Sequence, residues 1–206
     1  MQGIEFTEYS ARAIRAGRKI QTRRVIRELA GRAEHFYFYA PTEWAAGTIR
    51  STWWAGPNSI PMEYLHDHDY EKMTPCRARY GVPGDMLYVR EPWRRDAFGV
   101  RFKSACGARP GPWKPGRFLR EADAGIVITL TDVRVERLNA ISPADAIAEG
   151  VELPERGDVL WTTHSPKEIA VESFAAHWNH IHAHDGFGWT ANPYVFVYTF
   201  RPWNDR

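Results

Sequence analysis

The stretch "GIVITLTDVRVERL", residues 125–138, is rich in β-branched residues and predicts a long strand. The C-terminal "WTANPYVFVYTF", residues 189–200, predicts a second strand centred on Val195 and Val197. Two shorter strands are predicted in "KIQTRRVI", residues 19–26, and after the Pro-Gly-Asp turn of "VPGDMLYVREPW", residues 82–93. Alternation in the former places Thr22 and Arg24 on one face and Arg23 on the other.

Three helices are predicted between these strands. The first runs from near Thr7 to Ala16, with Thr7 as N-cap and Gly17 as the left-handed terminator. The second is short and lies in "ISPADAIAEG", residues 141–150, where Ser142 and Pro143 mark its start and Gly150 its end. The third starts at "SPKE", residues 165–168, and ends near "HAHDG". Strands therefore outnumber helices, and the pattern favours a β-rich mixed α/β fold, a small barrel with peripheral helices.

The 206 residues suit a single domain with insertions. We expect an aromatic-rich insertion at about 31–75, in which "HFYFYA" and "GTIRSTWW" pair as a hairpin, and a Gly- and Pro-rich loop at 94–124. The sequence has no signal-like start and no apolar run of membrane-spanning length, so we expect a cytoplasmic protein without a membrane partner. Cys76 and Cys106 have no partner motif and are expected to be reduced thiols.

Basic residues are concentrated at the N-terminus. The whole chain has a formal charge of only +2, with Arg outnumbering Lys 22 to 5. Residues 1–30, by contrast, hold seven basic and three acidic side chains, a net charge of +4. This cluster suits phosphates or a nucleic-acid backbone, or else it is a solvated helix face.

Metal and nucleotide motifs are weak or absent in the sequence. His177, His180 and His184 have helical spacing, and His180, His182 and His184 have strand spacing. Neither set has an acidic partner that would fix a metal geometry, and "HDHD" at 66–69 lies in a loop. There is no G-x-S-x-G elbow, P-loop or dinucleotide fingerprint. We therefore predict no metal and no cofactor.

Lys19, Thr22 and Glu149 are the candidate catalytic residues. A threonine hydroxyl becomes a useful nucleophile only when a base takes its proton, and a lysine serves as that base only if its pKa is well below the usual ~10.4. Nearby arginines and burial both lower a lysine pKa. Glu149 lies in the last turn of its predicted helix, where the helix dipole disfavours the ionised form; it is then either a general acid or a solvated surface residue.

The string "AGRKIQTRR" resembles the G-x-K-x-x-T-x-R signature of ASCH domains, which have a PUA-like β-barrel fold. Its conserved positions correspond to Gly17, Lys19, Thr22 and Arg24. The segments "VPGDMLYVREPW", "TDVRVERLNAISPADAIAEGV" and "WTANPYVFVYTF" resemble the larger, phage- and prophage-associated members, in the same order along the chain. Together these blocks cover somewhat under half of the sequence.

The resemblance implies an amidohydrolase that removes the acyl group from N4-acetylcytidine or a related nucleoside. By that resemblance Thr22 attacks the amide carbonyl, Lys19 takes its proton, and Glu149 protonates the leaving amine or positions water. The substrate-binding residues we predict are Arg24, Glu91 and Trp93. Trp93 and Trp113 either stack on a base or are packing residues. The chain is about twice the size of the compact enzymes, and "WKPGRFLREADAG" at 113–125 replaces their aromatic and His-containing stretch.

Two other functions fit the same resemblance. PUA-like barrels frequently recognise RNA or modified bases, and a basic cluster with nearby aromatics suits single-stranded RNA. Some relatives are suggested to cleave RNA, which would make this chain a metal-independent ribonuclease. The low net charge argues against strong nonspecific binding of long nucleic acid, whereas one nucleoside in a pocket needs few cations.

Overall fold

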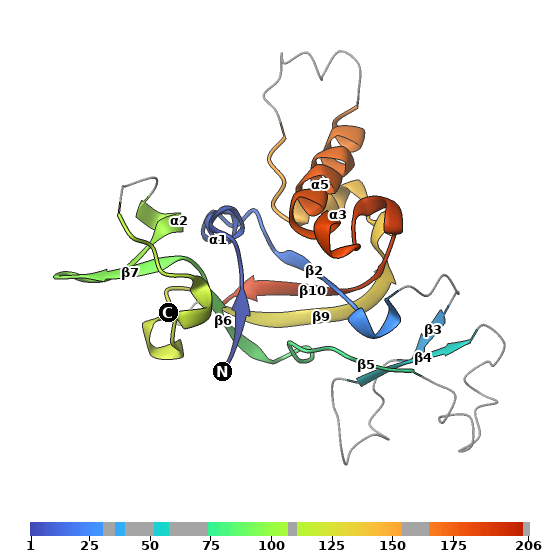
Figure 1. The fold of residues 1–206 in the computed structure, drawn as a ribbon, viewed down its shortest axis with the longest axis horizontal. Helices are drawn as coiled ribbons and strands as arrows, with labels where there is room; N and C mark the ends of the chain where they lie inside the picture. Colours follow the sequence, from blue (N-terminus) through green and yellow to red (C-terminus); the bar gives the residue numbers. More distant parts are fainter. Residues whose placement is uncertain (31–35, 40–51, 58–73, 107–110, 154–164, 204–206) are drawn as a thin grey trace.

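The computed structural model describes residues 1–30, 36–39, 52–57, 74–106, 111–153 and 165–203. A five-stranded sheet forms its centre, in the order β1 (Gln2–Glu5), β6 (Met86–Arg90), β9 (Val127–Arg137), β10 (Tyr194–Pro202) and β2 (Gln21–Val25). Only the β1–β6 pair is parallel, and the other neighbours are antiparallel (Figure 1). The mixed α/β class and the four strands predicted from the sequence are confirmed, whereas β1 was not predicted.

Both faces of the sheet are buried, because the side chains of β10 alternate between two hydrophobic clusters. Phe196, Tyr198 and Phe200 join the cluster on one face, and Val195 and Val197 join the cluster on the other. The second cluster is completed by the helices α3 (Pro143–Ala148) and α5 (Pro166–His182), which cover that face (Figure 1). Its helical members are the buried residues Ala146, Ala170, Phe174 and Trp178.

The predicted helix boundaries are confirmed. In α1 (Glu8–Arg15) the Thr7 side chain accepts a hydrogen bond from the Ser10 N–H, and Gly17 has the left-handed φ of 70°. Ser142 caps α3 in the same way. A complete capping box formed by Ser165 and Glu168 starts α5.

Two smaller sheets flank the centre. In one, β3 (Phe36–Tyr39), β4 (Thr52–Pro57) and β5 (Thr74–Arg77) are antiparallel. The first predicted hairpin strand is confirmed as β3, but it pairs with residues 54–57, so only Trp54 of the predicted partner "GTIRSTWW" lies opposite it. In the other, β7 (Trp93–Asp96) pairs with β8 (Gly99–Phe102), followed by α2 (Lys103–Cys106), within a stretch that we predicted to be a loop. The "HDHD" sequence at 66–69 lies outside the described residues.

The described strands do not close into the barrel that we expected. β1 and β2 are the two edges of the central sheet, and no backbone pairing joins them in the described part of the chain. They are nevertheless linked by a side chain, since the Arg24 Nη2 atom on β2 donates to the Glu5 carbonyl on β1 at 2.6 Å. The sheet is therefore open but curved, with Arg24 spanning the space between its edges.

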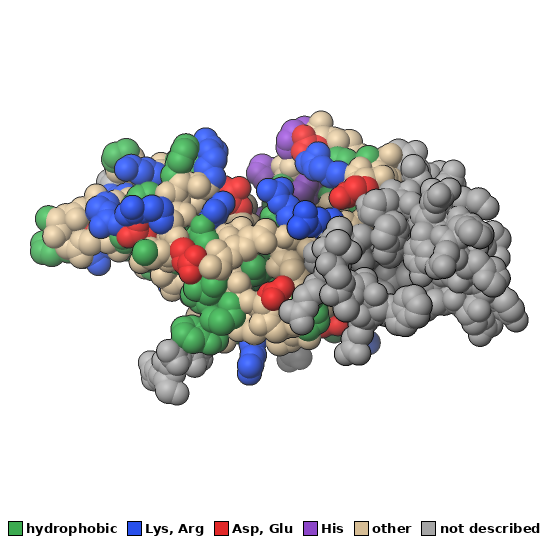
Figure 2. Space-filling model, turned by 90° about the horizontal axis from the view of Figure 1, so that it is seen from below, with side chains coloured by type: hydrophobic (Ala, Val, Ile, Leu, Met, Phe, Trp, Pro, Cys, Tyr) green, Lys and Arg blue, Asp and Glu red, His purple; other side chains and the backbone are tan. Residues whose placement is uncertain are grey.

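No helix among the described residues is long and apolar enough to cross a bilayer. The histidines that the structure describes, at 177, 180, 182 and 184, all lie on α5 or in the short 3-10 turn that follows it. In Figure 2 they gather in one area of the surface, beside basic and acidic side chains.

Candidate active site

A tight turn after α1 positions Lys19. Gly17 adopts its left-handed conformation, and the backbone N–H groups of Arg18 and Lys19 both donate to the Ala13 carbonyl, at 2.9 and 3.2 Å. The chain then enters β2, and the Ile20 N–H donates to the Ala148 carbonyl at 2.8 Å. This short antiparallel bridge places Lys19 opposite Glu149.

Gly150 allows the end of α3 to approach Lys19 closely. Its φ of 89° is a conformation that residues with a side chain rarely adopt. A Cβ atom at this position would lie 2.9 Å from the Cβ atoms of both Ala13 and Lys19. Glu149, the C-cap of α3, is thereby brought against the N-terminal segment.

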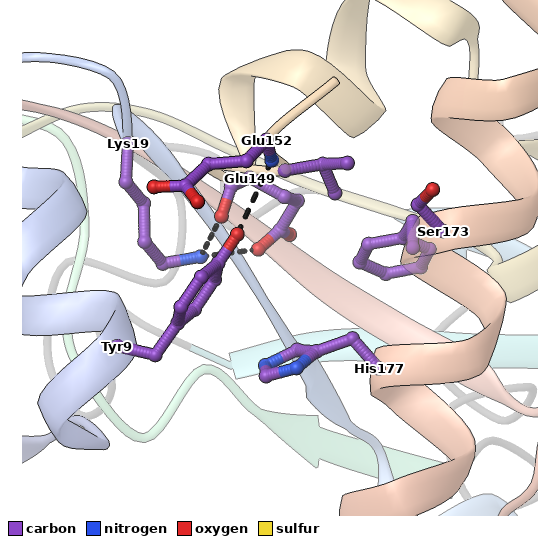
Figure 3. A pocket seen from close by; sticks show the side chains of 8 residues that line it. Tyr9, Lys19, Glu149, Glu152, Ser173 and His177 are labelled. Atoms are coloured by element: carbon purple, nitrogen blue, oxygen red, sulfur yellow. Dashed lines mark hydrogen bonds and ion pairs between the residues drawn. The ribbon is translucent and has the colours of Figure 1, made fainter. Parts of the chain in front are cut away.

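Lys19 and Glu149 form a buried ion pair. The Lys19 Nζ atom lies 2.5 Å from Glu149 Oε2 and donates to the Glu149 carbonyl oxygen at 2.8 Å (Figure 3). The residues are only 4% and 8% exposed. Glu149 is therefore not the solvated surface residue that was one of our two expectations.

A second cation offsets the unfavourable position of Glu149 at a helix C-terminus. The Arg23 Nη1 atom donates to Glu149 Oε1 at 3.0 Å, so each carboxylate oxygen has its own cationic donor. Arg23 is 2% exposed, and its Nη2 atom also pairs with Glu136 Oε1 at 2.5 Å. This arrangement suits an ionised carboxylate.

Burial lowers the pKa of Lys19 below its ordinary value. Glu149 acts in the opposite direction, and the positive charges of Arg24 and Arg23 add to the lowering. The pKa of His177, on α5, is also lowered, first by burial and then by the charge of Lys19. The lowered pKa favours the neutral amine, which is the form of Lys19 that can act as a base.

One cavity of about 350 Å³ is lined by all three candidate catalytic residues, Lys19, Thr22 and Glu149. It lies beside the last residue of β1, Glu5, and the two residues that follow, Phe6 and Thr7. The β2 residues Arg23 and Arg24 also line it. The cavity is therefore at the space between the two edges of the central sheet. The opposite wall comes from α5 and consists of Phe174, His177, Trp178, Ile181 and His182.

Of the three predicted substrate-binding residues, the structure brings only Arg24 into this cavity. Its guanidinium lies 5.1 Å above the Phe6 ring and 5.6 Å from the Tyr80 ring. The Arg24 Nε atom is buried and has no hydrogen-bond partner among the described residues. Arg24 therefore keeps a donor for a ligand.

Glu91 and Trp93 lie outside the cavity lining, although Pro92 between them contributes to it. Glu91 is fully buried, pairs with Arg15 at 2.5 Å and accepts a short hydrogen bond from the Ser104 hydroxyl. Trp93 is buried at the start of β7, with the Lys114 Nζ atom 5.2 Å from its ring. Glu91 links α1 to α2 through Arg15 and Ser104, and Trp93 packs β7 against the segment that contains Lys114.

The described histidines, on and just after α5, do not form a metal site. In the described part of the chain, no three His, Cys, Asp or Glu side chains are placed to hold an ion. His177 and His182 face the cavity, whereas His180 and His184 are exposed. Burial, followed by the charge of Arg24, lowers the pKa of His182 to about 4.

Two residues that shape the site, Arg23 and His177, were not among the site residues predicted from the sequence. The strand pattern placed Arg23 on the face opposite Thr22, but nothing local indicated that Glu149 and Glu136 would face it. His177 follows Phe174 by three residues and precedes Trp178, so helical periodicity placed it beside the buried face of α5. That position is the signal that could have identified it.

Comparison of the chain with protein-family models, with curated proteins and with solved structures gives no match.

Proposed function

We propose that this protein is an amidohydrolase that removes the acyl group from an N4-acylated cytidine or a related nucleoside. The observation that carries the proposal is the meeting of Lys19, Thr22 and Glu149 at one cavity, although 130 positions separate the first from the last. A chain brings such distant polar groups together and buries them at a cost, which is the usual mark of a functional site.

The reaction has two halves. In the first, Lys19 reacts in its neutral form, which its lowered pKa favours over the ammonium of the ion pair. The Thr22 Oγ1 atom bonds to the acyl carbon, its proton passes to this amine, and the carbon–nitrogen bond breaks as the exocyclic amine of cytosine takes up a proton. In the second half, water attacks the Thr22 ester while Lys19 takes one of its protons, the carbon–oxygen bond breaks, that proton passes to the Thr22 oxygen, and a carboxylic acid leaves. Glu149, 2.5 Å from Lys19, carries the proton between the lysine and the leaving nitrogen.

Arg24 supports this chemistry with a free donor. Its buried Nε atom makes no hydrogen bond within the described structure. Arg24 lines the same cavity as Thr22. A preorganised cationic donor beside a carbonyl stabilises the negative charge that develops on its oxygen during attack. Arg24 therefore either stabilises the negative charge on the carbonyl oxygen or binds the nucleobase.

The fold we propose for this activity is the PUA-like one of ASCH domains. The open sheet is compatible with it, because the edges β1 and β2 lie within reach of one side chain and the cavity lies between them. The mouth of a small barrel is a common place for a ligand.

The test is conversion of N4-acetylcytidine to cytidine, followed by the change in ultraviolet absorbance. Wild type should turn over, and Thr22→Val, which keeps the β-branched shape but lacks the hydroxyl, should lose at least about a thousandfold in kcat. Thr22→Ser retains a nucleophile and is the matched control, expected to keep measurable activity. An active Thr22→Val variant with native stability would remove the nucleophile from the proposal.

Binding without turnover is the competing function, because Arg24 and the aromatic side chains Phe6 and Trp178 could hold a base in the same cavity. If wild type converts no acylcytidine but binds short RNA in a salt-dependent manner, the protein is a binding module. Fragments of labelled RNA that still form in the presence of a chelator would instead identify a ribonuclease.

A further inference from the structure

Basic residues are concentrated in a second part of the molecule, around the β7–β8 hairpin. Residues 93–106 and 111–120 together hold seven basic side chains and one acidic side chain, a net charge of +6. Because the whole chain has a formal charge of +2, all other residues together have a net charge of −4. The low total charge therefore conceals a strongly basic surface. Figure 2 shows Lys and Arg side chains beside hydrophobic ones at the end of the molecule where β7 lies in Figure 1.

This basic surface reaches the edge of the candidate active-site cavity through residues 114–118. The backbone groups of Trp93 and Lys114 donate to each other at 3.1 and 2.7 Å, which fixes the start of this segment beside β7. Pro115 and Gly116 line the cavity. A Cβ atom on Gly116 would lie 2.8 Å from backbone atoms at the end of β6, so the segment is packed closely against the central sheet.

Two available cations flank the residues that line the cavity. Lys114 and Arg117 are exposed, and neither has an acidic partner among the described residues. The Lys114 Nζ atom lies 5.2 Å from the centroid of the Trp93 ring, and the Arg117 guanidinium lies 4.9 Å from that of the Phe118 ring. Other cations of this surface are paired with carboxylates, namely Arg95, Arg101, Lys103 and Arg120. The charges of Lys114 and Arg117 are therefore available to an anion at the edge of the cavity.

Exposed aromatic rings accompany these cations. Phe118 is 59% exposed, and Phe98, between β7 and β8, is 86% exposed. Exposed rings next to cations are the combination that binds single-stranded nucleic acid, because the rings stack on unpaired bases and the cations contact the phosphates. A base in a duplex would first have to leave its stack to enter a cavity, which favours a single strand.

We propose that the substrate is an acylated cytidine within a single strand of RNA, and that Lys114, Arg117 and Phe118 bind the nucleotides next to it. The inference rests on the proposed function. The acylated base enters the cavity, the adjacent phosphates contact the two cations, and a neighbouring base stacks on the Phe118 ring. A free nucleoside has neither a phosphate nor a neighbouring base, so it would leave these side chains without a role.

The experiment compares free N4-acetylcytidine with a single-stranded RNA of about ten nucleotides that carries one N4-acetylcytidine at its centre. Conversion of the RNA is measured after digestion to nucleosides. At low salt, wild type should have a kcat/KM at least about tenfold higher for the RNA than for the nucleoside. Two phosphate contacts predict that a tenfold rise in salt lowers kcat/KM for the RNA about 25-fold and leaves that for the nucleoside nearly unchanged.

Three variants test the assigned side chains. The double variant Lys114→Gln/Arg117→Gln should remove the salt dependence and lower kcat/KM for the RNA at least about tenfold at low salt, with the loss confined to the RNA. Phe118→Ala should lower kcat/KM for the RNA at least about fivefold and keep the salt dependence. The matched control Arg77→Gln/Lys167→Gln removes two exposed cations, from β5 and from the start of α5, and should behave like wild type. All these side chains are exposed, so the variants should fold.

The outcomes separate this inference from the proposed function. If wild type converts neither the nucleoside nor the RNA, the proposed function fails and the inference fails with it. If wild type converts the nucleoside at least as well as the RNA, or if the double variant and its control affect the RNA equally, the amidohydrolase stands but this surface does not bind its substrate. A preference for RNA that the double variant loses and the control keeps supports the inference.

Discussion

Glu149→Gln should strongly destabilise the protein, and the loss should depend on pH. The substitution keeps the shape of the side chain but leaves the Lys19 ammonium, 4% exposed, without the carboxylate 2.5 Å away. Breaking a buried pair by removing one partner typically costs about 3–5 kcal/mol. Lys19 can limit the loss by giving up its proton, and keeping an ordinary lysine neutral at pH 7 costs about 4.6 kcal/mol. We therefore expect a loss of about 3–4 kcal/mol at pH 7.

The direction of the pH dependence follows from the lowered pKa of Lys19. In the folded wild type this pKa already lies below its ordinary value, and losing Glu149, which raises it, lowers it further. A group whose pKa is lowered by folding contributes most stability above the unfolded value of ~10.4 and loses it as the pH falls. The difference between variant and wild type should therefore shrink, to about 1–2 kcal/mol at pH 9.5.

Urea unfolding of wild type and Glu149→Gln at pH 7 and pH 9.5 measures the loss of unfolding free energy and its change with pH. Glu152→Gln is the matched control, because it breaks an exposed ion pair with Arg18 close to the same site and should cost less than about 1 kcal/mol. Adding Lys19→Met to Glu149→Gln should recover most of the lost stability, since no unpaired ammonium then remains buried. A loss below about 1 kcal/mol at pH 7, or one that grows as the pH rises, would refute the buried-pair reasoning.

Three further predictions concern the surroundings of the site. Gly150→Ala should lower the free energy of unfolding by about 2–4 kcal/mol in urea, because of the left-handed φ and the 2.9 Å approach to Ala13 and Lys19; unchanged stability would contradict this packing. Glu91→Gln should cost about 2–4 kcal/mol, because Arg15 loses its buried partner, and an effect within 0.5 kcal/mol, as for a typical surface substitution, would show that the pair is dispensable. An NMR titration should show that the pKa of His182 is lowered to about 4. The free energy of unfolding should therefore fall as the pH drops from about 6.5 toward 4, and the His182→Gln variant should lose this part of the pH dependence.

The cavity between the edges of the central sheet gives the site its chemistry. In a closed barrel, the backbone groups of neighbouring edge strands would hydrogen-bond to each other. Here β1 and β2 are not paired in the described structure, and the Arg24 guanidinium joins them through the Glu5 carbonyl. The same guanidinium lies over the Phe6 ring at 5.1 Å, and this contact holds the guanidinium at the cavity. None of its described hydrogen bonds is to an acidic side chain. Its charge thus remains available to a ligand.

Local sequence signals determined the secondary structure of this protein. Caps at Thr7, Ser142 and Ser165 and glycines at 17 and 150 marked the helix boundaries, because capping and left-handed backbone conformations depend on one or two residues. Alternating β-branched and aromatic residues marked β9 and β10 in the same way. Short strands such as β1 and β7 carry little such signal and were missed. The partner of β1, the strand β6, lies more than 80 residues away, whereas β7 pairs with the neighbouring β8 in a short hairpin.

From the sequence alone, the motif at 17–24 predicted Lys19, Thr22 and Arg24 as site residues, and the end of the second helix predicted Glu149; all four line one cavity. Tertiary structure decided what surrounds them: the pairing of Lys19 with Glu149, the second cation at Arg23, and the exclusion of Glu91 and Trp93 from the cavity. A residue's type and spacing specify which chemistry it can perform. Its charge state and partners depend on burial and on side chains more than a hundred positions away, which only the packing of α1, α3 and α5 against the sheet brings together.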